Sequence, residues 1–284
     1  MFRSLIFVPG NSARFVEKAK TLPADIICLD LEDSVAANEK ASARKIVADA
    51  LAHRGEYQGS VYVRINSVDS GLVAEDLTAA VRARLDGVVV PKVNDEREIM
   101  DVVKQVASLE SPSRPSVNIM PSIETAKGVV NAYSIAKADD RINCLVFGVF
   151  DFLHDMKLDY DEHDSTSYSF ARAKIPLDAR AAGIDAIDAI WQRIEDLDGL
   201  VRDAAVARLL GYSGKSLIHP SQIEPVHKVF RPSVDQIEWA KKVVLALGEA
   251  MEKGSGRGAV RLEGKMIDAV HYKQARAILD ATKE

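Results

Sequence analysis

Short apolar runs alternate with amphipathic stretches along most of the chain. We interpret the apolar runs as β-strands at residues 4–9, 26–31, 61–65, 87–93, 117–123, 144–148, 183–187 and 215–218. Between them, apolar residues recur at helical spacing, for example over residues 11–22, 39–52 and 95–109. Runs such as "GVVVPKV" and "CLVFGV" are apolar throughout, which is typical of parallel strands covered on both faces. The pattern predicts a (β/α)₈ TIM barrel. A doubly wound open sheet is the alternative, but no glycine-rich phosphate-binding motif follows the first strand.

A long C-terminal stretch follows the last barrel strand, which is complete near His219. The pattern there predicts a helix over residues 233–253 with Ser233 as its N-cap, and then a glycine-rich hinge at 254–258. A short hairpin-like piece and a last helix from about Asp268 complete the chain. We therefore divide the chain into a barrel domain, residues 1–232, and a helical extension, residues 233–284, which serves as a lid or as an arm between subunits.

Composition and charge narrow the class of protein. The 284 residues fit one α/β barrel with an extension, and the net charge of −5 leaves no basic stripe for nucleic acid. Cys28 and Cys144 lie inside apolar runs, so we expect free buried thiols. The sequence has no secretory signal pattern and no apolar run long enough to span a membrane. These features predict a soluble, cytoplasmic protein.

Polar residues gather at the predicted strand ends, where barrel enzymes carry their active sites. They are Asn11, Asp30, Glu32, Asp33, Arg64, Asn66, Lys92, Glu124, Asp151, Asp188 and His219. A single polar residue at a strand end often only caps a helix or forms an ion pair. Charged groups at nearly every strand end instead predict a site on this rim.

Glu124 and Asp151 would end neighbouring strands, whose backbones lie about 5 Å apart. Two carboxylates that close repel each other unless a proton or a cation lies between them. Mg²⁺ accepts one or two carboxylates and keeps open positions for water and substrate, whereas zinc would need cysteine or more histidine ligands. The alternative is that Asp151 caps a helix while Glu124 pairs with Lys92 or Arg64.

Two cations on the rim have competing interpretations. Arg64 follows β-branched residues in "VYVRINS", and its planar guanidinium suits a carboxylate or an enolate oxygen. Lys92 could form a Schiff base in a metal-free aldolase, or it could pair with an acid of "DLEDS". In that motif, Asp33 could instead cap the following helix.

Several motifs resemble the citrate lyase β-subunit family, which includes citramalyl-CoA and malyl-CoA lyases. They are "RSLIFVPGNSARFVEKA", "DIICLDLEDSVAANEKASAR", "VYVRINS", "GVVVPKV", "MPSIETAKGVVNA", "FARAKIPLDARAAGIDAID", "GYSGKSLIHPSQI" and "GKMIDAVHYKQA". The resemblance implies that Glu124 and Asp151 bind Mg²⁺ and that Arg64 binds the reacting acyl oxygens. It also implies that Arg14 and Lys18 lie near the phosphates of a coenzyme A ligand.

The resemblance further implies a homo-oligomer, a trimer or a hexamer, in which Asp268 is an acid delivered from a neighbouring subunit. The alternative is that Asp268 only caps the last helix. The implied reaction is retro-Claisen cleavage of a 3-hydroxyacyl-CoA thioester to acetyl-CoA and a 2-keto acid, with Glu32 or a metal-bound hydroxide as the base. Three rival functions remain: a citryl-acyl carrier protein lyase subunit, a malyl-CoA thioesterase, and a non-catalytic subunit that binds a keto acid or CoA.

The sequence departs from the family pattern at three places that bear on the substrate, one of which is the acidic segment "KLDYDEHDSTSYS". Phe150 stands beside Asp151 where relatives often have a small or acidic residue, so we expect it to narrow the pocket. Pro176 falls inside "FARAKIPLDARAAG", where a proline is expected to kink or break a helix.

Overall fold

Parallel strands form a closed barrel in the computed structural model, which describes residues 2–111, 116–161, 164–252 and 259–282. The strands lie side by side in chain order, and β1 pairs with β8 to close the barrel. Their bounds are β1 (Ser4–Pro9), β2 (Ile26–Asp30), β3 (Ser60–Arg64), β4 (Gly87–Val90), β5 (Asn118–Ile123), β6 (Cys144–Phe147), β7 (Asp185–Asp188) and β8 (Gly214–Leu217). The TIM-barrel prediction is confirmed, and the open sheet is excluded.

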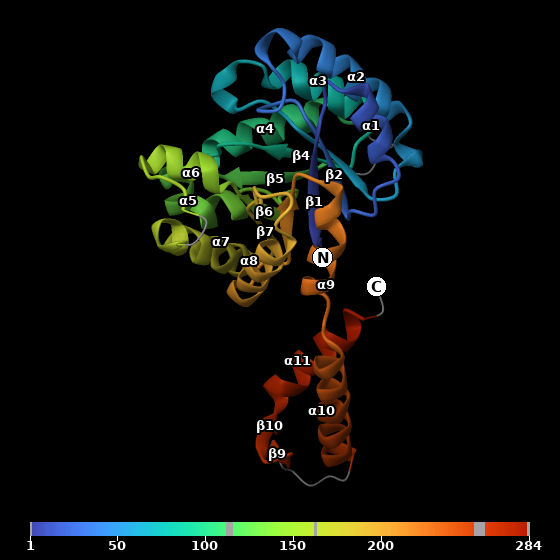
Figure 1. Ribbon diagram of the computed structural model, residues 1–284, viewed down its shortest axis with the longest axis vertical. Helices are drawn as coiled ribbons and strands as arrows, with labels where there is room; N and C mark the ends of the chain where they lie inside the picture. Colours follow the sequence, from blue (N-terminus) through green and yellow to red (C-terminus); the bar gives the residue numbers. More distant parts are fainter. Residues whose placement is uncertain (1, 112–115, 162–163, 253–258, 283–284) are drawn as a thin grey trace. The chain divides into compact units, whose positions relative to one another are not determined.

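Helices connect successive strands and cover the outside of the barrel (Figure 1). They are α1 (Ala13–Ala19), α2 (Lys40–Ala52), α3 (Val73–Ala83), α4 (Glu96–Leu109), α5 (Ala126–Lys137), α6 (Val149–Met156), α7 (Ser169–Ala182) and α8 (Leu197–Leu210). Helix α4 illustrates why these segments are helical. Asp95 caps its N-terminus by accepting hydrogen bonds from the backbone N–H groups of Arg97 and Glu98, and its buried residues recur every three or four positions.

Large side chains fill the barrel interior, so the barrel is a packed core and not a pore. The buried cluster consists of Leu5, Ile26, Cys28, Tyr62, Val89, Met120, Cys144, Val146 and Ile187. Both cysteines are buried free thiols, as predicted. This packed interior supports the rim, because the residues that follow each strand cannot move without disturbing the strand below them.

Pro176 does not break α7, which runs without interruption from Ser169 to Ala182. Proline has no N–H group, so the carbonyl of Arg172, four residues earlier, loses its helical partner. The hydroxyl of Tyr212 donates a hydrogen bond to that carbonyl at 2.9 Å. The predicted break was therefore wrong, because a residue distant in sequence replaces the missing bond. Gly183 was also assigned wrongly: it ends α7 in a left-handed conformation, φ 84°, and β7 begins at Asp185.

The chain divides into two compact units, Met1–His227 and Lys228–Glu284. A 3₁₀ turn (Pro220–Gln222) and α9 (Ile223–Phe230) follow β8, and the second unit contains α10 (Val234–Glu252), the β9 (Ala259–Leu262) and β10 (Lys265–Asp268) hairpin, and α11 (Ala269–Asp280).

The second unit has a small apolar core of its own, to which α10, β10 and α11 contribute Ala240, Val243, Leu247, Ile267 and Ala275. Ser233 accepts a hydrogen bond from the Gln236 backbone N–H at 3.1 Å, as expected of an N-cap. The predicted hinge at 254–258 lies outside the described residues. None of the helices in the described part of the chain is long and apolar enough to cross a membrane.

Candidate active site

Asp30 and Arg64 form an ion pair at the rim with two hydrogen bonds. The register of β2 and β3 places the two residues side by side. The guanidinium Nε and Nη2 donate to the two carboxylate oxygens of Asp30, each at 2.7 Å. Burial alone would raise the pKa of Asp30, but the Arg64 guanidinium holds it below its usual value. The Arg64 guanidinium also lies 4.6 Å from the centre of the Phe7 ring. It is therefore fixed in one orientation.

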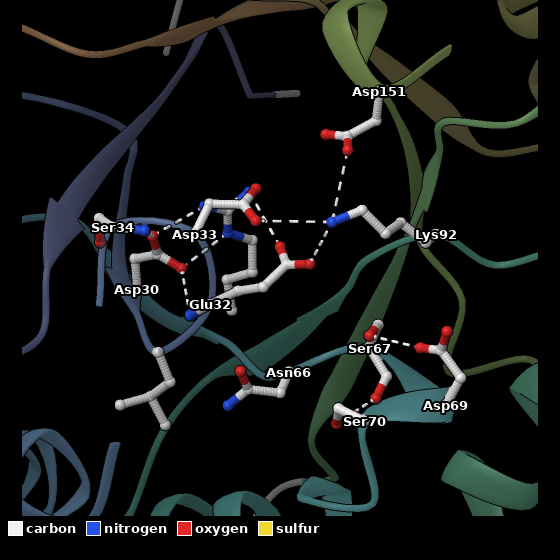
Figure 2. Close-up of polar contacts among 12 residues, drawn as sticks. Asp30, Glu32, Asp33, Ser34, Asn66, Ser67, Asp69, Ser70, Lys92 and Asp151 are labelled. Atoms are coloured by element: carbon white, nitrogen blue, oxygen red, sulfur yellow. Dashed lines mark hydrogen bonds and ion pairs between the residues drawn. The ribbon is translucent and has the colours of Figure 1, made fainter. Parts of the chain in front are cut away.

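Lys92 joins the acids of the "DLEDS" motif to the far side of the rim (Figure 2). Its Nζ lies 2.7 Å from Glu32 Oε1, 3.5 Å from Asp33 Oδ1 and 3.4 Å from Asp151 Oδ1. The predicted pairing with "DLEDS" is thus confirmed. Three carboxylate neighbours favour the ammonium form, which is a poor nucleophile, so the arrangement does not favour a Schiff base. Lys92 also adopts a left-handed backbone conformation, φ 54°.

Glu32, the predicted base, has an unusual protonation equilibrium. Burial raises its pKa to about 7, against the opposing charge of Arg64. Its Oε2 lies 3.2 Å from Arg64 Nη1, an ion-pair distance, but makes no hydrogen bond of regular geometry to a described residue. A carboxyl group with a pKa near neutrality suits proton transfer.

Glu124 and Asp151 approach the rim from adjacent strands. Glu124 directly follows β5, and Asp151 lies in the first turn of α6, which follows β6. Gly148, and not Asp151, is the N-cap of α6, so the helix-cap interpretation of Asp151 was wrong. The Glu124 side chain packs directly against the backbone of Gly148, so a Cβ at position 148 would lie 2.4 Å from Glu124 Cγ. Only glycine leaves room for Glu124 in this position.

Glu124 forms no ion pair with a cation among the described residues, although the charges of Arg64 and Lys92 lower its pKa from a distance. Its side chain is 3% exposed, and its Oε2 has no hydrogen-bond partner there. Burial raises the pKa of Glu124, a hydrogen bond with Ser122 lowers it, and the nearby Asp151 raises it further. Within the described chain, neither Lys92 nor Arg64 forms the alternative ion pair with Glu124; the nearest lysine contact is with Asp151.

A divalent cation fits this environment, because it would neutralise the two carboxylates and give the isolated oxygen a partner. No group of three or more potential His, Cys, Asp or Glu ligands occurs among the residues that the structure describes. An ion held by Glu124 and Asp151 would therefore need water or substrate oxygens as further ligands. This requirement matches Mg²⁺ and not structural zinc.

A cavity of about 430 Å³ opens beside these residues. Its lining residues are Phe7, Pro9, Asp30, Asp33, Ser34, Arg64, Ser122, Glu124, Val146, Phe147, Gly148, Val149, Phe150, Asp151, Ile190, Ser216 and Ile218. Sequence reasoning missed Ser122, Ile190 and Ile218. Strand alternation could have found Ser122, which lies two residues before Glu124 and hence on the same face. Glu32 and Lys92 are not among the lining residues.

The residues expected near coenzyme A lie on α1, at the edge of a second cavity of about 290 Å³. Lys18, Phe15 and His219 line it, whereas Arg14 is exposed and does not. His219 does not reach the first cavity: its Nδ1 contacts the Ser221 hydroxyl at 2.7 Å and caps the turn after β8. Neither the Lys18 nor the Arg14 contact with coenzyme A is tested, so both stay predictions.

Asp268 is the N-cap of α11 in the second unit. It accepts hydrogen bonds from the backbone N–H groups of Val270 at 3.0 Å and His271 at 3.3 Å. Its carboxylate also lies 2.7 Å from the His271 ring nitrogen. Asp268 therefore caps α11, as the alternative interpretation predicted. The catalytic role in a neighbouring subunit stays a prediction.

Asp188 belongs to a different cluster, although sequence reasoning placed it on the catalytic rim. Its carboxylate binds Arg172 Nη2 at 2.7 Å and Lys215 Nζ at 2.6 Å. Asp203 completes the cluster with contacts to Arg172 Nη1 at 2.8 Å and to Lys215 Nζ at 2.5 Å. We call Arg172, Asp188, Asp203 and Lys215 the seam network, because it links α7, β7, α8 and β8. The sequence did contain a signal for this network: Lys215 lies inside the strand "GKSL", and a buried ammonium requires an acidic partner.

Proteins of known identity are similar to this chain over nearly its whole length. The citrate lyase subunit beta of Haemophilus influenzae is 36% identical over 99% of this chain and 97% of its own. The mitochondrial citramalyl-CoA lyase of Rattus norvegicus is 33% identical over 98% of this chain and 85% of its own. The structure is similar to that of CitE from Mycobacterium tuberculosis in complex with magnesium, acetoacetate and coenzyme A. That match has a TM-score of 0.80 and 28% identity, and covers 100% of this chain and 98% of the other.

The sequence profile described as HpcH/HpaI aldolase/citrate lyase matches residues 3–220, which include all eight barrel strands. With the profile match and the full-length relatives taken together, the chain belongs to the HpcH/HpaI aldolase/citrate lyase family.

Proposed function

We propose that this chain is a Mg²⁺-dependent carbon–carbon lyase that cleaves a 3-hydroxyacyl-CoA thioester of the citramalyl-CoA or malyl-CoA type. Its products would be acetyl-CoA and a 2-keto acid. The observation that carries the proposal is the buried Glu124, whose Oε2 has no hydrogen-bond partner in the described chain and which shares one cavity with Asp151 and Arg64. The magnesium in the related CitE complex and the citramalyl-CoA lyase relative support it.

Each rim residue has a part in the proposed reaction. Glu124 and Asp151 hold the cation, which supplies Lewis acidity at the substrate's carboxylate and hydroxyl oxygens when bound. Arg64, which Asp30 fixes and which lines the cavity, would stabilise the negative charge that grows on the thioester oxygen. Glu32 would receive the hydroxyl proton through a water molecule, because Glu32 does not itself line the cavity.

Asp268 from a neighbouring subunit would protonate the carbanion carbon, in a homotrimer or a hexamer. Mixed oligomers test this assignment. Asp268→Asn subunits combined with Arg64→Ala subunits would regain activity, because some sites then receive both intact residues. A lack of recovery in verified mixed oligomers would mean that Asp268 acts only as the cap of α11.

Citryl cleavage on an acyl carrier protein is the second candidate, because the Haemophilus influenzae relative is a citrate lyase subunit. The fold and the metal pair serve both reactions, so the carrier separates them. Cleavage of free CoA thioesters by the isolated chain supports the first candidate. Activity that requires an acyl carrier protein supports the second.

The test of the metal pair combines calorimetry with product analysis. Asp151→Asn should weaken Mg²⁺ binding and abolish cleavage of malyl-CoA and citramalyl-CoA, with the barrel still folded by circular dichroism. Asp101→Asn is the matched control, because Asp101 lies on α4 and pairs with Lys104 on the surface. Unchanged Mg²⁺ affinity in Asp151→Asn would contradict the assignment. Release of free malate and CoA, in place of acetyl-CoA and glyoxylate, would identify a thioesterase.

A further inference from the structure

The cavity beside Glu124 and Asp151 is lined by both charged and apolar residues. Its charged lining residues are Asp30, Asp33, Arg64, Glu124 and Asp151. Most of the other lining residues are apolar, and we call these the apolar wall: Phe7, Val146, Phe147, Val149, Phe150, Ile190 and Ile218. A substrate substituent that contacts neither the acids nor Arg64 therefore meets mostly apolar side chains.

Phe150 occupies this wall immediately before Asp151. Its ring lies 4.9 Å, centre to centre, from the ring of Tyr160. The Tyr160 ring stacks on Tyr168 at 6.4 Å, and Tyr168 lies 6.5 Å from Phe147, another lining residue. Aromatic pairs at these separations attract each other beyond simple burial. The contact with Tyr160 restricts the Phe150 ring, so this part of the wall has a defined position.

Each cationic side chain that the structure describes at the rim already contacts a carboxylate, so a second substrate carboxylate would lack a cationic partner there. Arg64 is the cationic residue among the cavity-lining residues of the described chain, and two of its nitrogens already bind Asp30. The ammonium of Lys92 contacts Glu32, Asp33 and Asp151. Even with a bound divalent ion, the five carboxyl groups of Asp30, Glu32, Asp33, Glu124 and Asp151 outnumber the four positive charges of the ion, Arg64 and Lys92.

We propose that the site accepts thioesters whose hydroxyl-bearing carbon carries a small uncharged substituent, hydrogen or methyl, and rejects the carboxymethyl group of a citryl thioester. Phe150, supported by Tyr160, is the residue that determines this selectivity. The proposal rests on the proposed function and specifies its substrate. Its physical reason is that a carboxylate against the apolar wall loses hydration and gains no partner.

The experiment compares three substrates on one carrier: malyl-CoA, citramalyl-CoA and citryl-CoA, each with Mg²⁺, so that only the substituent changes. We expect kcat/KM for citryl-CoA to be at least about 100-fold below the better of the other two. Phe150→Ala should reduce this preference about tenfold by opening space. Calorimetry should show unchanged Mg²⁺ affinity, which separates the wall from the adjacent Asp151.

A second variant tests charge separately from size. Ile190→Arg places a cation on the apolar wall, and a charge-assisted hydrogen bond should raise citryl-CoA cleavage about ten- to hundredfold. Phe170→Ala is the matched control for Phe150→Ala, because Phe170 lies on α7 and is 75% exposed. It should leave the substrate preference unchanged.

The outcomes distinguish the two proposals. If wild-type protein cleaves citryl-CoA as well as the other two, the substituent inference is overturned and the lyase proposal stands. If none of the three is cleaved, the lyase proposal falls and the substituent inference falls with it. A selective wild type whose preference survives both Phe150→Ala and Ile190→Arg would overturn the assignment of this wall.

Discussion

The barrel holds two clusters of charged residues that differ in how their charges balance. The seam network pairs two cations, Arg172 and Lys215, with two carboxylates, Asp188 and Asp203. The rim cluster consists of Asp30, Glu32, Asp33, Arg64, Lys92, Glu124 and Asp151, so five carboxyl groups share two cations.

The difference separates a structural network from a site prepared for a ligand. Every carboxylate of the seam network contacts a cation, and each cation contacts both acids. In the rim cluster, Glu32 and Glu124 each have a buried oxygen with no hydrogen-bond partner in the described chain, and the pKa of each is raised chiefly by burial. Buried charge that is left unbalanced costs stability, so it is retained where a ligand supplies the balance.

Removing one charge from the balanced network should have the largest effect on stability. Asp188→Asn leaves Arg172 and Lys215 buried with Asp203 as their one carboxylate partner in the seam network. We expect a loss of about 3–5 kcal/mol in the free energy of unfolding, measured by urea denaturation. Asp101→Asn should change it by less than about 0.5 kcal/mol. A loss for Asp188→Asn as small as the control's would show that the seam network is not the structural element.

Arg64→Lys should affect turnover more than folding. The lysine keeps the positive charge but cannot form both hydrogen bonds to Asp30. Its ammonium group therefore has no fixed orientation in the site. Turnover should fall by about 10²–10³. Arg141→Lys, at a partly buried pair with Glu110, is the matched control and should keep nearly full turnover. Near-normal turnover in Arg64→Lys would argue that Arg64 has only a structural role.

The raised pKa of Glu32 predicts a pH dependence of stability. The folded protein keeps a proton that the unfolded chain releases above the ordinary value of 4.5, and loses it only near the folded value of about 7. This contribution is therefore complete below pH 4.5 and disappears as the pH rises to about 7, by at most about 1.4 kcal/mol per pH unit. Glu32→Gln should flatten the decline between pH 5 and about 7 in urea titrations. An identical pH profile in the variant would show that Glu32 titrates normally.

Glu124→Gln should produce the smallest change and the opposite sign. Without Mg²⁺, it removes an uncompensated buried carboxylate beside Asp151, so the free energy of unfolding should rise by about 0.5–2 kcal/mol. Adding Mg²⁺ should stabilise the wild type and no longer stabilise the variant, as measured by thermal unfolding. Destabilisation of the metal-free variant would mean that Glu124 already has a partner and that the rim is balanced like the seam.

Much of the barrel could be predicted from the sequence, because eight apolar runs with helical stretches between them leave few other folds. The pairing of Lys92 with "DLEDS" and the approach of Glu124 to the rim also followed from strand order. The role of Asp188 could not be predicted, because a carboxylate at a strand end looks the same in sequence whether it faces a cavity or a buried lysine. Its partners lie 16 and 27 residues away, and only the packing of α7 against β7 and β8 brings them together.

Gly148 links the proposed metal pair, Glu124 and Asp151, to a position that carries no acid. Since a Cβ there would lie 2.4 Å from Glu124 Cγ, an alanine at 148 and a glutamate at 124 cannot both keep their places. A duplicated gene with a larger residue at position 148 would displace Glu124 from the position in which we propose that it binds the cation, even with both acids intact. A genome survey that inspects only Glu124 and Asp151 would count such altered copies as intact. A survey that also inspects position 148 could separate them from copies that keep the proposed site.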